Sequence, residues 1–481
     1  MSVVIGIDLG TTTITALALD VQTRDILATS TVPNAAEITS PADKARGRSE
    51  WDAGAIAEMA CGCLREVTRR LGAGWSRLGG LGITGQQHGV VVVDDLRPLT
   101  PLVNWQDRRG EETYPGGTLT YVQEAIRRAG ADAPQRTGCR LAAGFGAVTL
   151  FWMRTNGVLP AAGTTCFLMD YFGALLTGTA PVTDATCAGS SGVFDVKAGT
   201  WDADLIAALG LPPSFFPEVQ PSGTPLGTVT ASMADATGLP EGLSVFGGIG
   251  DNQASFLGSV ADRGDSVLVN VGTGGQVSVY ADSFGFDPAL ETRPFPGGGY
   301  LLACAGLCGG RSYALLERFY RQVSEQVCGT APGETLYAAM NRLAESAPRG
   351  AGGLVCEPFF TGTRHQPELR ASWTGVSAEN FTPANMTRAL LEGMARAFRT
   401  GYEAISRLGG GGKKQLVGAG NGLRENVVLA RCVADEFGLP LRLPRHREEA
   451  AYGAALMAAV GAGLFPDLPA AGGLVRYAEA R

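Results

Sequence analysis

Residues 3–20, VVIGIDLGTTTITALALD, place a carboxylate at the end of an apolar run and follow it with a turn rich in hydroxyl groups. The apolar residues on each side of the turn predict two strands, with Asp8 at the tip of the first. The backbone N–H groups and hydroxyls of Thr11, Thr12 and Thr13 suit an anion, and a nearby carboxylate suits the magnesium ion that accompanies a phosphate chain. The stretch therefore predicts a phosphate-binding hairpin. The alternative is an ordinary hairpin with a solvated Asp8.

A second stretch repeats this design in the other half of the chain. Residues 265–282, DSVLVNVGTGGQVSVYAD, again give an apolar strand, a Gly-Thr turn and an alternating strand, with Asn270 and Thr273 near the turn. Two hairpins of one design indicate two domains that face each other across a cleft. We place the boundary near residue 245, after the Pro- and Gly-rich segment 217–227.

A third candidate is the carboxylate in GGIGDNQASFLGS, residues 247–259. Asp251 follows a glycine-rich break and precedes an Ala- and Ser-rich helix start. It could take a proton from a substrate hydroxyl, the task of an aspartate in kinases generally. The alternative is that Asp251 only caps the helix.

Two further segments suit the recognition of a sugar. Residues 82–95, GITGQQHGVVVVDD, place Gln86, Gln87 and His88 in a polar turn, and NWQDRRG follows at 104–110. An aromatic ring such as Trp105 suits the C–H face of a carbohydrate, while the amide of Gln106 and the carboxylate of Asp107 suit its hydroxyls. The alternative is that Trp105 belongs to the core and that Asp107 pairs with a neighbouring arginine on the surface.

The small residues in LAAGFG, 141–146, precede a predicted helix over 147–153. If this loop borders the sugar, they leave room for a long substrate and Phe145 forms a wall. If it does not, they only allow a helix to pack closely on a strand. The same ambiguity applies to the strand, glycine-rich turn and helix of 416–441. These glycines favour an adenine site but also fit a plain strand-to-helix turn.

The elements that must position these residues follow from periodicity. Apolar residues at helical spacing predict helices over 55–71, 387–408, 426–437 and 448–460. The last is rich in Ala and Gly, which suits close packing against a neighbouring backbone. Strands that alternate with such helices indicate α/β layers.

Composition limits the classes of function. The 481 residues are 45% hydrophobic and 18% charged, which indicates a globular chain long enough for two domains. A net charge of −7 argues against nucleic acid or an anionic membrane as the partner. The ten cysteines lie scattered through apolar segments, without the spacing of a disulfide framework or zinc site. With no secretory signal or membrane-spanning run visible, we expect a cytoplasmic protein.

Taken together and in order, these segments resemble the FGGY carbohydrate kinases over nearly the whole chain. The resemblance implies an α/β protein of two ribonuclease-H-like domains with the actin and sugar-kinase fold, residues 1–245 and 246–481, with the active site in the interdomain cleft. It implies ATP and Mg²⁺ as cofactors, Asp8 as the metal-binding residue and Asp251 as the catalytic base. It also implies a nucleotide site made by Asp8, Gly10, Thr11, Thr12, Thr13, Gly272, Thr273, Gly274, Gly309, Gly310, Gly418, Gly420 and Asn421. The implied sugar site is made by Gln87, His88, Trp105, Gln106, Asp107, Phe145 and Asp251.

Within the family the resemblance is strongest to the sedoheptulokinases, through NWQD, GDNQAS and residues 144–152 and 362–377. It implies phosphorylation of a terminal ketose hydroxyl, with sedoheptulose 7-phosphate as the product. Xylulose, ribulose and glycerol are the alternatives. Glycerol is disfavoured because Gln87 and His88 stand where glycerol kinases have an Arg-Glu pair. A non-catalytic sugar and ATP sensor is a more distant alternative, and the chain is expected to be a monomer or homodimer.

Overall fold

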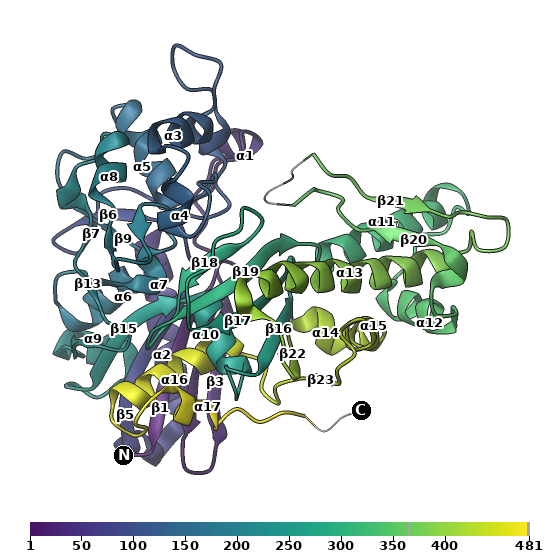
Figure 1. The fold of residues 1–481 in the computed structure, drawn as a ribbon. Helices are drawn as coiled ribbons and strands as arrows, with labels where there is room; N and C mark the ends of the chain where they lie inside the picture. The colour runs from purple at the N-terminus through teal and green to yellow at the C-terminus, as the bar shows by residue number, and fades with distance from the viewer. Residues whose placement is uncertain (364–365, 367, 479–481) are drawn as a thin grey trace.

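The computed structural model describes residues 1–363, 366 and 368–478. Two larger sheets, one in each half of the chain, are flanked by helices (Figure 1). This is the α/β organisation predicted from the alternation of strands and helices. Residues 364, 365 and 367 of the segment 362–377 lie outside the described residues. No helix in the described ranges is long and apolar enough to cross a membrane.

The first sheet carries the hairpin that was predicted at the start of the chain. Its strand order is β14-β15-β5-β1-β2-β3, formed by β1 (Val3–Leu9), β2 (Thr13–Asp20), β3 (Asp25–Pro33), β5 (Leu78–Gly85), β14 (Pro225–Thr228) and β15 (Ser244–Gly250). Strand β1 is antiparallel to β2 and parallel to β5, so Asp8 lies opposite Thr15 on one side and Thr84 on the other. Asp8 therefore stands one residue before the end of a central strand.

The first sheet continues past the boundary expected near residue 245. Strand β15 pairs in parallel with β5 and antiparallel with β14, so a division at residue 245 would cut a strand inside the sheet. The Pro- and Gly-rich segment 217–227 forms β13 and the start of the edge strand β14 instead of a linker. We propose that the first domain extends through α10 (Asp251–Ser259).

The first half of the chain adds smaller elements around this sheet. Its further strands are β4 (Glu50–Trp51), β6 (Val91–Asp94), β7 (Arg97–Pro98), β8 (Leu102–Val103), β9 (Thr164–Cys166), β10 (Thr183–Asp184), β11 (Phe194–Asp195), β12 (Thr200–Trp201) and β13 (Val219–Gln220). Its α-helices are α1 (Pro41–Ala45), α2 (Ala53–Leu71), α3 (Tyr121–Ala129), α4 (Ala133–Thr137), α5 (Gly146–Thr155), α6 (Leu168–Thr177), α7 (Ala185–Ala188), α8 (Ala203–Ala208) and α9 (Ala231–Thr237). Short 3₁₀ helices are η1 (Gly72–Arg77), η2 (Arg109–Glu111) and η3 (Pro213–Phe215). Helix α2 agrees with the helix predicted over 55–71.

The second sheet contains the second predicted hairpin. Its order is β18-β19-β17-β16-β22-β23, formed by β16 (Ser266–Val271), β17 (Gly275–Ala281), β18 (Glu291–Pro294), β19 (Tyr300–Leu307), β22 (Gln415–Ala419) and β23 (Leu441–Arg442). Strands β16 and β17 are antiparallel, β16 and β22 are parallel, and Asn270 lies opposite Gln276. Each of the two sheets thus contains its own hairpin, and in each sheet a parallel strand pairs with the first strand of that hairpin.

The α-helices in the second half of the chain are α11 (Gly310–Gln326), α12 (Tyr337–Ser346), α13 (Pro383–Ile405), α14 (Asn421–Glu425), α15 (Val427–Phe437), α16 (Glu449–Gly461) and α17 (Leu468–Gly472). The remaining elements are β20 (Val355–Glu357), β21 (Ser372–Thr374), the 3₁₀ helix η4 (Ala351–Gly353) and the π-helix η5 (Ser406–Gly410). The helices predicted over 387–408, 426–437 and 448–460 correspond to α13, α15 and α16.

Helix α16 returns from the end of the chain to cover the first sheet, beside α10 (Figure 1). A Cβ on Gly6 of β1 would lie 1.9 Å from the carbonyl oxygen of Ala451, and one on Gly82 of β5 would lie 2.0 Å from that of Ala454. The absence of side chains at these positions lets the helix backbone rest on the strands. The close packing predicted from the Ala and Gly content of this segment is confirmed, and it brings the start of α16 next to Asp8.

Candidate active site

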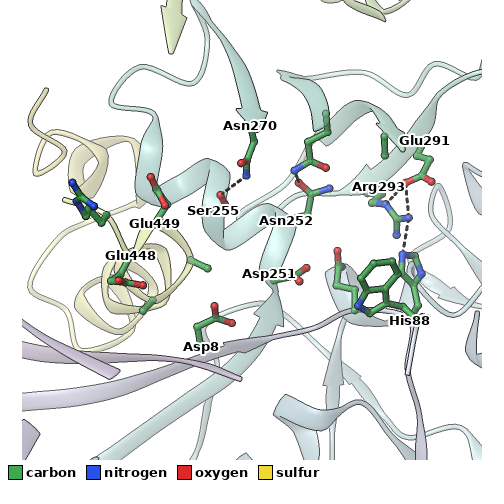
Figure 2. Close-up of a pocket in the computed structure, with 17 residues that line it drawn as sticks. Asp8, His88, Asp251, Asn252, Ser255, Asn270, Glu291, Arg293, Glu448 and Glu449 are labelled. Carbon is green, nitrogen blue, oxygen red and sulfur yellow. Dashed lines mark hydrogen bonds and ion pairs between the residues drawn. The ribbon is translucent and has the colours of Figure 1, made fainter. Parts of the chain in front are cut away.

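A cavity of about 390 Å³ lies between the two sheets (Figure 2). It brings together five of the residues predicted from the sequence, namely Asp8, Gln87, His88, Trp105 and Asp251. The rest of its lining comes from the second sheet, from α10 and from the start of α16: Asn252, Ser255, Asn270, Gln276, Glu291, Arg293, Ala305, Arg447, Glu448, Glu449, Ala450 and Ala451.

Asp251 is the first residue of α10, directly after strand β15, and Gly250 is the N-cap residue of that helix. Burial raises the pKa of the Asp251 carboxyl to about 6, while the backbone N–H of Asn252 and the charge of Arg293 oppose this shift. A carboxyl with this pKa is largely ionised at neutral pH yet basic enough to take up a proton.

Thr186 fixes the backbone immediately before Asp251. Its hydroxyl accepts a hydrogen bond from the N–H of Gly250 at 2.9 Å, and its carbonyl accepts one from Nε2 of Gln87 at 3.0 Å. A Cβ on Gly250 would lie 2.0 Å from the same Nε2, so glycine is needed for this approach. The start of α10 and the Gln87 turn are thereby held together.

Asp8 faces two other carboxylates in the cavity. Burial, Asp251 and Glu448 together raise the pKa of the Asp8 carboxyl to about 8. Burial and the neighbouring Glu449 also raise the pKa of Glu448. The Oδ1 atom of Asp8 is buried and accepts no hydrogen bond from the described residues, while the residue as a whole is half-buried at the cavity.

These residues fit the expected magnesium ion, because a divalent cation would pair with the orphaned Oδ1 atom and relieve the repulsion among the carboxylates. Among the described residues no group of three or more His, Cys, Asp or Glu side chains is arranged to hold a metal ion. Mg²⁺ is commonly bound through one or two carboxylates together with substrate phosphates and water. Asp8 is thus suited to a shared site with a phosphate chain.

Hydrogen bonds join the turn of the first hairpin to Gln86 and Trp105, which belong to the two segments that suit the recognition of a sugar. The hydroxyl of Thr11 donates to Oε1 of Gln86 at 3.1 Å and accepts from Nε1 of Trp105 at 2.9 Å. Thr12 and Thr13 are exposed at the same turn. Gly10 completes it, since a Cβ there would lie 2.7 Å from the carbonyl oxygen of Thr13.

The second hairpin packs against the beginning of α11. The N–H of Gly310 donates to the carbonyl of Gly272 at 2.9 Å, and the N–H of Arg311 donates to that of Thr273 at 3.0 Å. A Cβ on Gly309 would lie 2.3 Å from the carbonyl carbon of Gly274. Gly272, Thr273, Gly274, Gly309 and Gly310 are therefore neighbours, although none of them lines the 390 Å³ cavity.

The glycines of the predicted adenine site have different surroundings. Gly418 lies within β22, where a Cβ would meet Leu423, Leu441 and Leu443, so its lack of a side chain is needed for core packing. Gly420 has φ +81°, which favours glycine, and Asn421 begins α14. Neither Gly418, Gly420 nor Asn421 lines the 390 Å³ cavity.

The predicted sugar residues separate into those at the cavity and those behind it. Trp105 is 42% exposed and lines the cavity, so it is not the core residue of the alternative interpretation. The ring of His88 stacks on Phe145 with centroids 4.4 Å apart, and Phe145 is buried behind it instead of forming a wall. Gln106 is exposed outside the lining.

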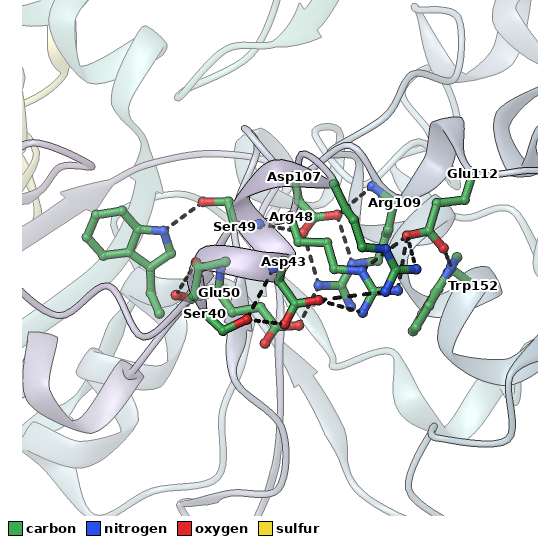
Figure 3. A network of polar contacts seen from close by, with 12 residues as sticks. Ser40, Asp43, Arg48, Ser49, Glu50, Asp107, Arg109, Glu112 and Trp152 are labelled. Atoms are coloured by element: carbon green, nitrogen blue, oxygen red, sulfur yellow. Dashed lines mark hydrogen bonds and ion pairs between the residues drawn. The ribbon is translucent and has the colours of Figure 1, made fainter.

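Asp107 also lies outside the cavity lining, in a buried polar network (Figure 3). Its Oδ1 accepts from the backbone N and Nε of Arg109, both at 2.8 Å. Its Oδ2 accepts from the N–H of Ser49 at 2.8 Å and from Nη2 of Arg109 at 3.0 Å. Both oxygens are occupied, so this geometry does not support a direct contact between Asp107 and a sugar. The pairing with an arginine was the alternative interpretation, but the pair is buried and not on the surface.

The small-residue loop is explained by close packing at Gly144. This residue has φ +83°, and a Cβ on it would lie 2.1 Å from the carbonyl oxygen of Trp105. The geometry fits the packing interpretation of the loop. Gly144 supports the backbone of a cavity residue without lining the cavity itself.

Sequence reasoning missed several lining residues on the second sheet. Glu291 and Arg293 are two residues apart on the edge strand β18, so their side chains share one face of it. Glu448 precedes the first turn of α16. Two opposite charges at strand spacing in the short segment ETRP were the available signal for Glu291 and Arg293.

The chain is a two-domain α/β protein with a carboxylate-lined cavity between its two larger sheets. Residues 3–258 match the N-terminal domain, and residues 309–462 the C-terminal domain, of the FGGY family of carbohydrate kinases. The chain belongs to this family and is a carbohydrate kinase.

Relatives with different substrates resemble the chain to a similar degree. It is 28% identical to sedoheptulokinase from Mus musculus, over 95% of this chain and 97% of that protein. It is 31% identical to glycerol kinase from Thermus brockianus, over 88% of this chain and 84% of that protein. The crystal structure of xylulose kinase from Rhodospirillum rubrum aligns with a TM-score of 0.86 at 30% identity, covering 99% of this chain and 93% of that one. These similarities establish the family, but they do not distinguish among sedoheptulose, glycerol and xylulose as the sugar.

Proposed function

We propose that this chain transfers the terminal phosphoryl group of ATP to the terminal hydroxyl of a ketose, with Asp251 as the base. The observation that carries this proposal is the position of Asp251 in the cavity. It stands at the start of α10, with Asp8 and Glu448 among the lining residues and with Gln87, His88 and Trp105 also present there. A base so placed can receive the proton of a sugar hydroxyl as that oxygen attacks the phosphoryl group.

The two hairpins would hold the phosphate chain. Backbone N–H groups at the turns Gly10–Thr13 and Gly272–Gly274 can donate to phosphate oxygens, and Gly309 and Gly310 hold the second turn in place, since the first N–H groups of α11 are bonded to carbonyls of that turn and of Gly309. Gly420 and Asn421 would border the adenosine, and Gly418 would act through packing. A magnesium ion at Asp8, when bound, would neutralise charge on the β and γ phosphate oxygens.

The chain's own groups account for the remaining requirements. Trp105 offers an apolar face to the sugar, and the side-chain amide of Gln87 binds its hydroxyls. The two ring nitrogens of His88 are occupied by the Ser190 carbonyl and by Arg293, so His88 acts by orienting its neighbours. Asp251 holds the attacking hydroxyl in hydrogen-bond reach and receives its proton. Enclosure between the two sheets limits the access of water, which would otherwise compete with the sugar for the phosphoryl group.

We propose sedoheptulose as the acceptor and sedoheptulose 7-phosphate as the product. This assignment is supported by the sedoheptulokinase relatives, which align over nearly their whole length, and by the resemblance of the segment 144–152 to the sedoheptulokinases, although this segment lies outside the cavity lining. That segment supplies Phe145 behind His88 and Trp152, whose ring lies 4.9 Å from the guanidinium of Arg109. Xylulose is the second candidate, because a xylulose kinase structure aligns over 99% of this chain at 30% identity.

The proposal is tested by measuring ADP release from Mg-ATP with sedoheptulose, xylulose, ribulose, fructose and glycerol. We expect the highest kcat/KM with sedoheptulose and a phosphate on its terminal carbon, located by NMR. A higher kcat/KM with xylulose would identify xylulose as the preferred acceptor and would still support the proposed kinase reaction. Binding of sugar and ATP without ADP release on any sugar would support the sensor interpretation and contradict the kinase reaction.

A further inference from the structure

Arg293 is a buried cation with an unused hydrogen-bond donor at the wall of the cavity (Figure 2). Its side chain is 2% exposed, as is that of its partner Glu291. Nη2 and Nε of Arg293 both donate to Oε2 of Glu291, at 2.6 and 3.0 Å. Nη1 is buried and has no hydrogen-bond partner among the described residues.

His88 helps to fix the orientation of this guanidinium from the first domain. Nη2 of Arg293 lies 3.3 Å from Nε2 of His88, and Nδ1 of His88 lies 2.8 Å from the carbonyl oxygen of Ser190. A guanidinium only donates and a carbonyl only accepts, so Nδ1 carries the proton and Nε2 accepts. The ring is neutral in this arrangement and bridges the two domains.

His88 occupies a backbone conformation that is unfavourable for a residue with a side chain. Its φ is +71°, and its N–H donates to the hydroxyl of Ser190 at 3.1 Å while its ring stacks on Phe145. Strained residues of this kind persist where several contacts hold them, and they are concentrated at functional sites. Here the strain serves to place the imidazole between Phe145 and Arg293.

A purely structural ion pair does not account for the Nη1 atom. A buried donor that forms no hydrogen bond destabilises the fold, so native proteins satisfy nearly all such groups. Nη1 belongs to a residue that lines the same cavity as Asp251 and Trp105. Because arginine has no acceptor atoms, the partner of Nη1 is an acceptor, either an oxygen of a ligand in the cavity or a water molecule that such an oxygen would displace.

We propose that Arg293 is a substrate-recognition residue whose Nη1 donates a hydrogen bond to an oxygen of the acceptor sugar. This proposal rests on the proposed kinase function and deepens it. Glu291 and His88 are positioning residues in this arrangement, because they orient the guanidinium of Arg293 and do not themselves contact the sugar. The contact lies near Asp251 and helps to select sugars that carry an oxygen at the matching position.

The first test is Arg293→Lys, which keeps a positive charge beside Glu291 but removes the forked second nitrogen. We expect the KM for the sugar preferred by the wild type to rise roughly 10- to 100-fold, as for loss of a hydrogen bond from a charged donor. The KM for ATP should stay within about twofold. The matched control is Arg388→Lys, because Arg388 also pairs with a glutamate, Glu392, and does not line the cavity.

A second variant tests whether a loss in Arg293→Lys comes only from misfolding. In Glu291→Met/Arg293→Met both charges are removed, so no unpaired charge stays buried. Melting temperature and binding of ADP, measured for each variant, report whether the fold and nucleotide site remain. The double variant should bind ADP as the wild type does and should show the same selective loss in the KM for the sugar.

The decisive measurement uses monodeoxy derivatives of the same sugar. In the wild type, removal of the oxygen that faces Nη1 should raise the KM, whereas in Arg293→Lys that removal should have almost no further effect. The proposal would be overturned if each monodeoxy derivative raised the KM by the same factor in the wild type and in Arg293→Lys. It would also be overturned if Arg293→Lys shifted the pH profile but left the KM for the sugar unchanged. If the proposed function fails, wild-type activity itself fails on the sugar panel, which is a different result.

Discussion

The indole Nε1 of Trp105 donates a hydrogen bond to the hydroxyl of Thr11 at 2.9 Å, and the same hydroxyl donates to Gln86. Trp105 belongs to the proposed sugar site and Thr11 to the proposed phosphate hairpin. The proposed sugar site and the proposed phosphate hairpin are therefore joined by one hydrogen bond. If these assignments hold, sugar bound at Trp105 would affect the conformation of the hairpin through this contact.

Trp105→Phe keeps an aromatic ring and removes the donor. We expect kcat/KM for the sugar to fall roughly 2- to 12-fold, corresponding to the loss of one hydrogen bond of about 0.5–1.5 kcal/mol. Thr11→Val removes this hydrogen bond together with the one from Thr11 to Gln86, so its loss should be at least as large, and the double variant should be no worse than Thr11→Val alone. Additive losses would show that the two residues act separately. Trp75→Phe, at an exposed tryptophan in η1, is the control.

The periodic elements of this fold were predictable because each carries its own signal. Both hairpins, α2 and α16 follow from alternation or helical spacing, and Asp8 and Asp251 stand out because each follows an apolar strand. Asp107 shows the limit of this reasoning. A carboxylate beside a tryptophan suits a sugar equally well whether or not its oxygens are already occupied, and only the fold shows that Arg109 and Ser49 occupy them.

Arg293 shows the opposite case, a cavity residue that sequence patterns did not select. Its sequence context is a short edge strand, and nothing local indicates that this strand reaches the Gln87-His88 turn from the other domain. Gly418 and Gly144 are similar, since a glycine required by leucine packing or by the Trp105 carbonyl looks the same in sequence as one beside a ligand. The cavity depends on contacts between distant segments, and periodicity does not encode these.

Asp251→Asn tests the proposed base. Turnover should fall by about two to four orders of magnitude, the usual range when a general base is lost, while ADP and sugar still bind. In the wild type, kcat/KM should decline as the pH falls through about 6, because protonation of Asp251 removes the base.

Asp52→Asn is the matched control for this substitution. Asp52 caps α2 by accepting from the N–H of Ala55 at 3.0 Å, and asparagine caps helices about as well as aspartate. Because Gly250 and not Asp251 is the N-cap residue of α10, Asp251 could support the helix only through its charge in the first turn, and in that case Asp251→Asn would retain near-normal turnover, as Asp52→Asn should. That outcome would contradict the proposed mechanism.

Asp8 should make the stability of the ligand-free protein depend on pH. Its pKa is about 8 in the folded protein against 3.8 for an ordinary aspartate, so the folded state holds the extra proton between these values. Stability should therefore fall as the pH rises from about 4 to 8. In Asp8→Asn the melting temperature should change less over this range.

Magnesium and ADP added together at pH 8 should raise the melting temperature of the wild type more than ADP alone, because the cation favours the ionised carboxylates. This magnesium-dependent increase should be lost in Asp8→Asn. Asp204→Asn, at an exposed position on α8, should behave as the wild type does. An equal magnesium effect in Asp8→Asn would remove Asp8 from the proposed metal site.

Gly144→Ala tests whether the small-residue loop acts through the backbone of Trp105. The new Cβ would lie 2.1 Å from the Trp105 carbonyl oxygen, so the loop or Trp105 must move, in addition to the strain of a positive φ. We expect a lower melting temperature and a similar fractional loss of kcat/KM with sedoheptulose and xylulose. Gly157→Ala is the control, because Gly157 also has a positive φ, +68°, but a Cβ there meets nothing within 4 Å. It should reproduce the backbone strain alone, with a smaller fall in melting temperature and unchanged kinetics. A loss confined to sedoheptulose in Gly144→Ala would show instead that the loop borders the far end of the sugar.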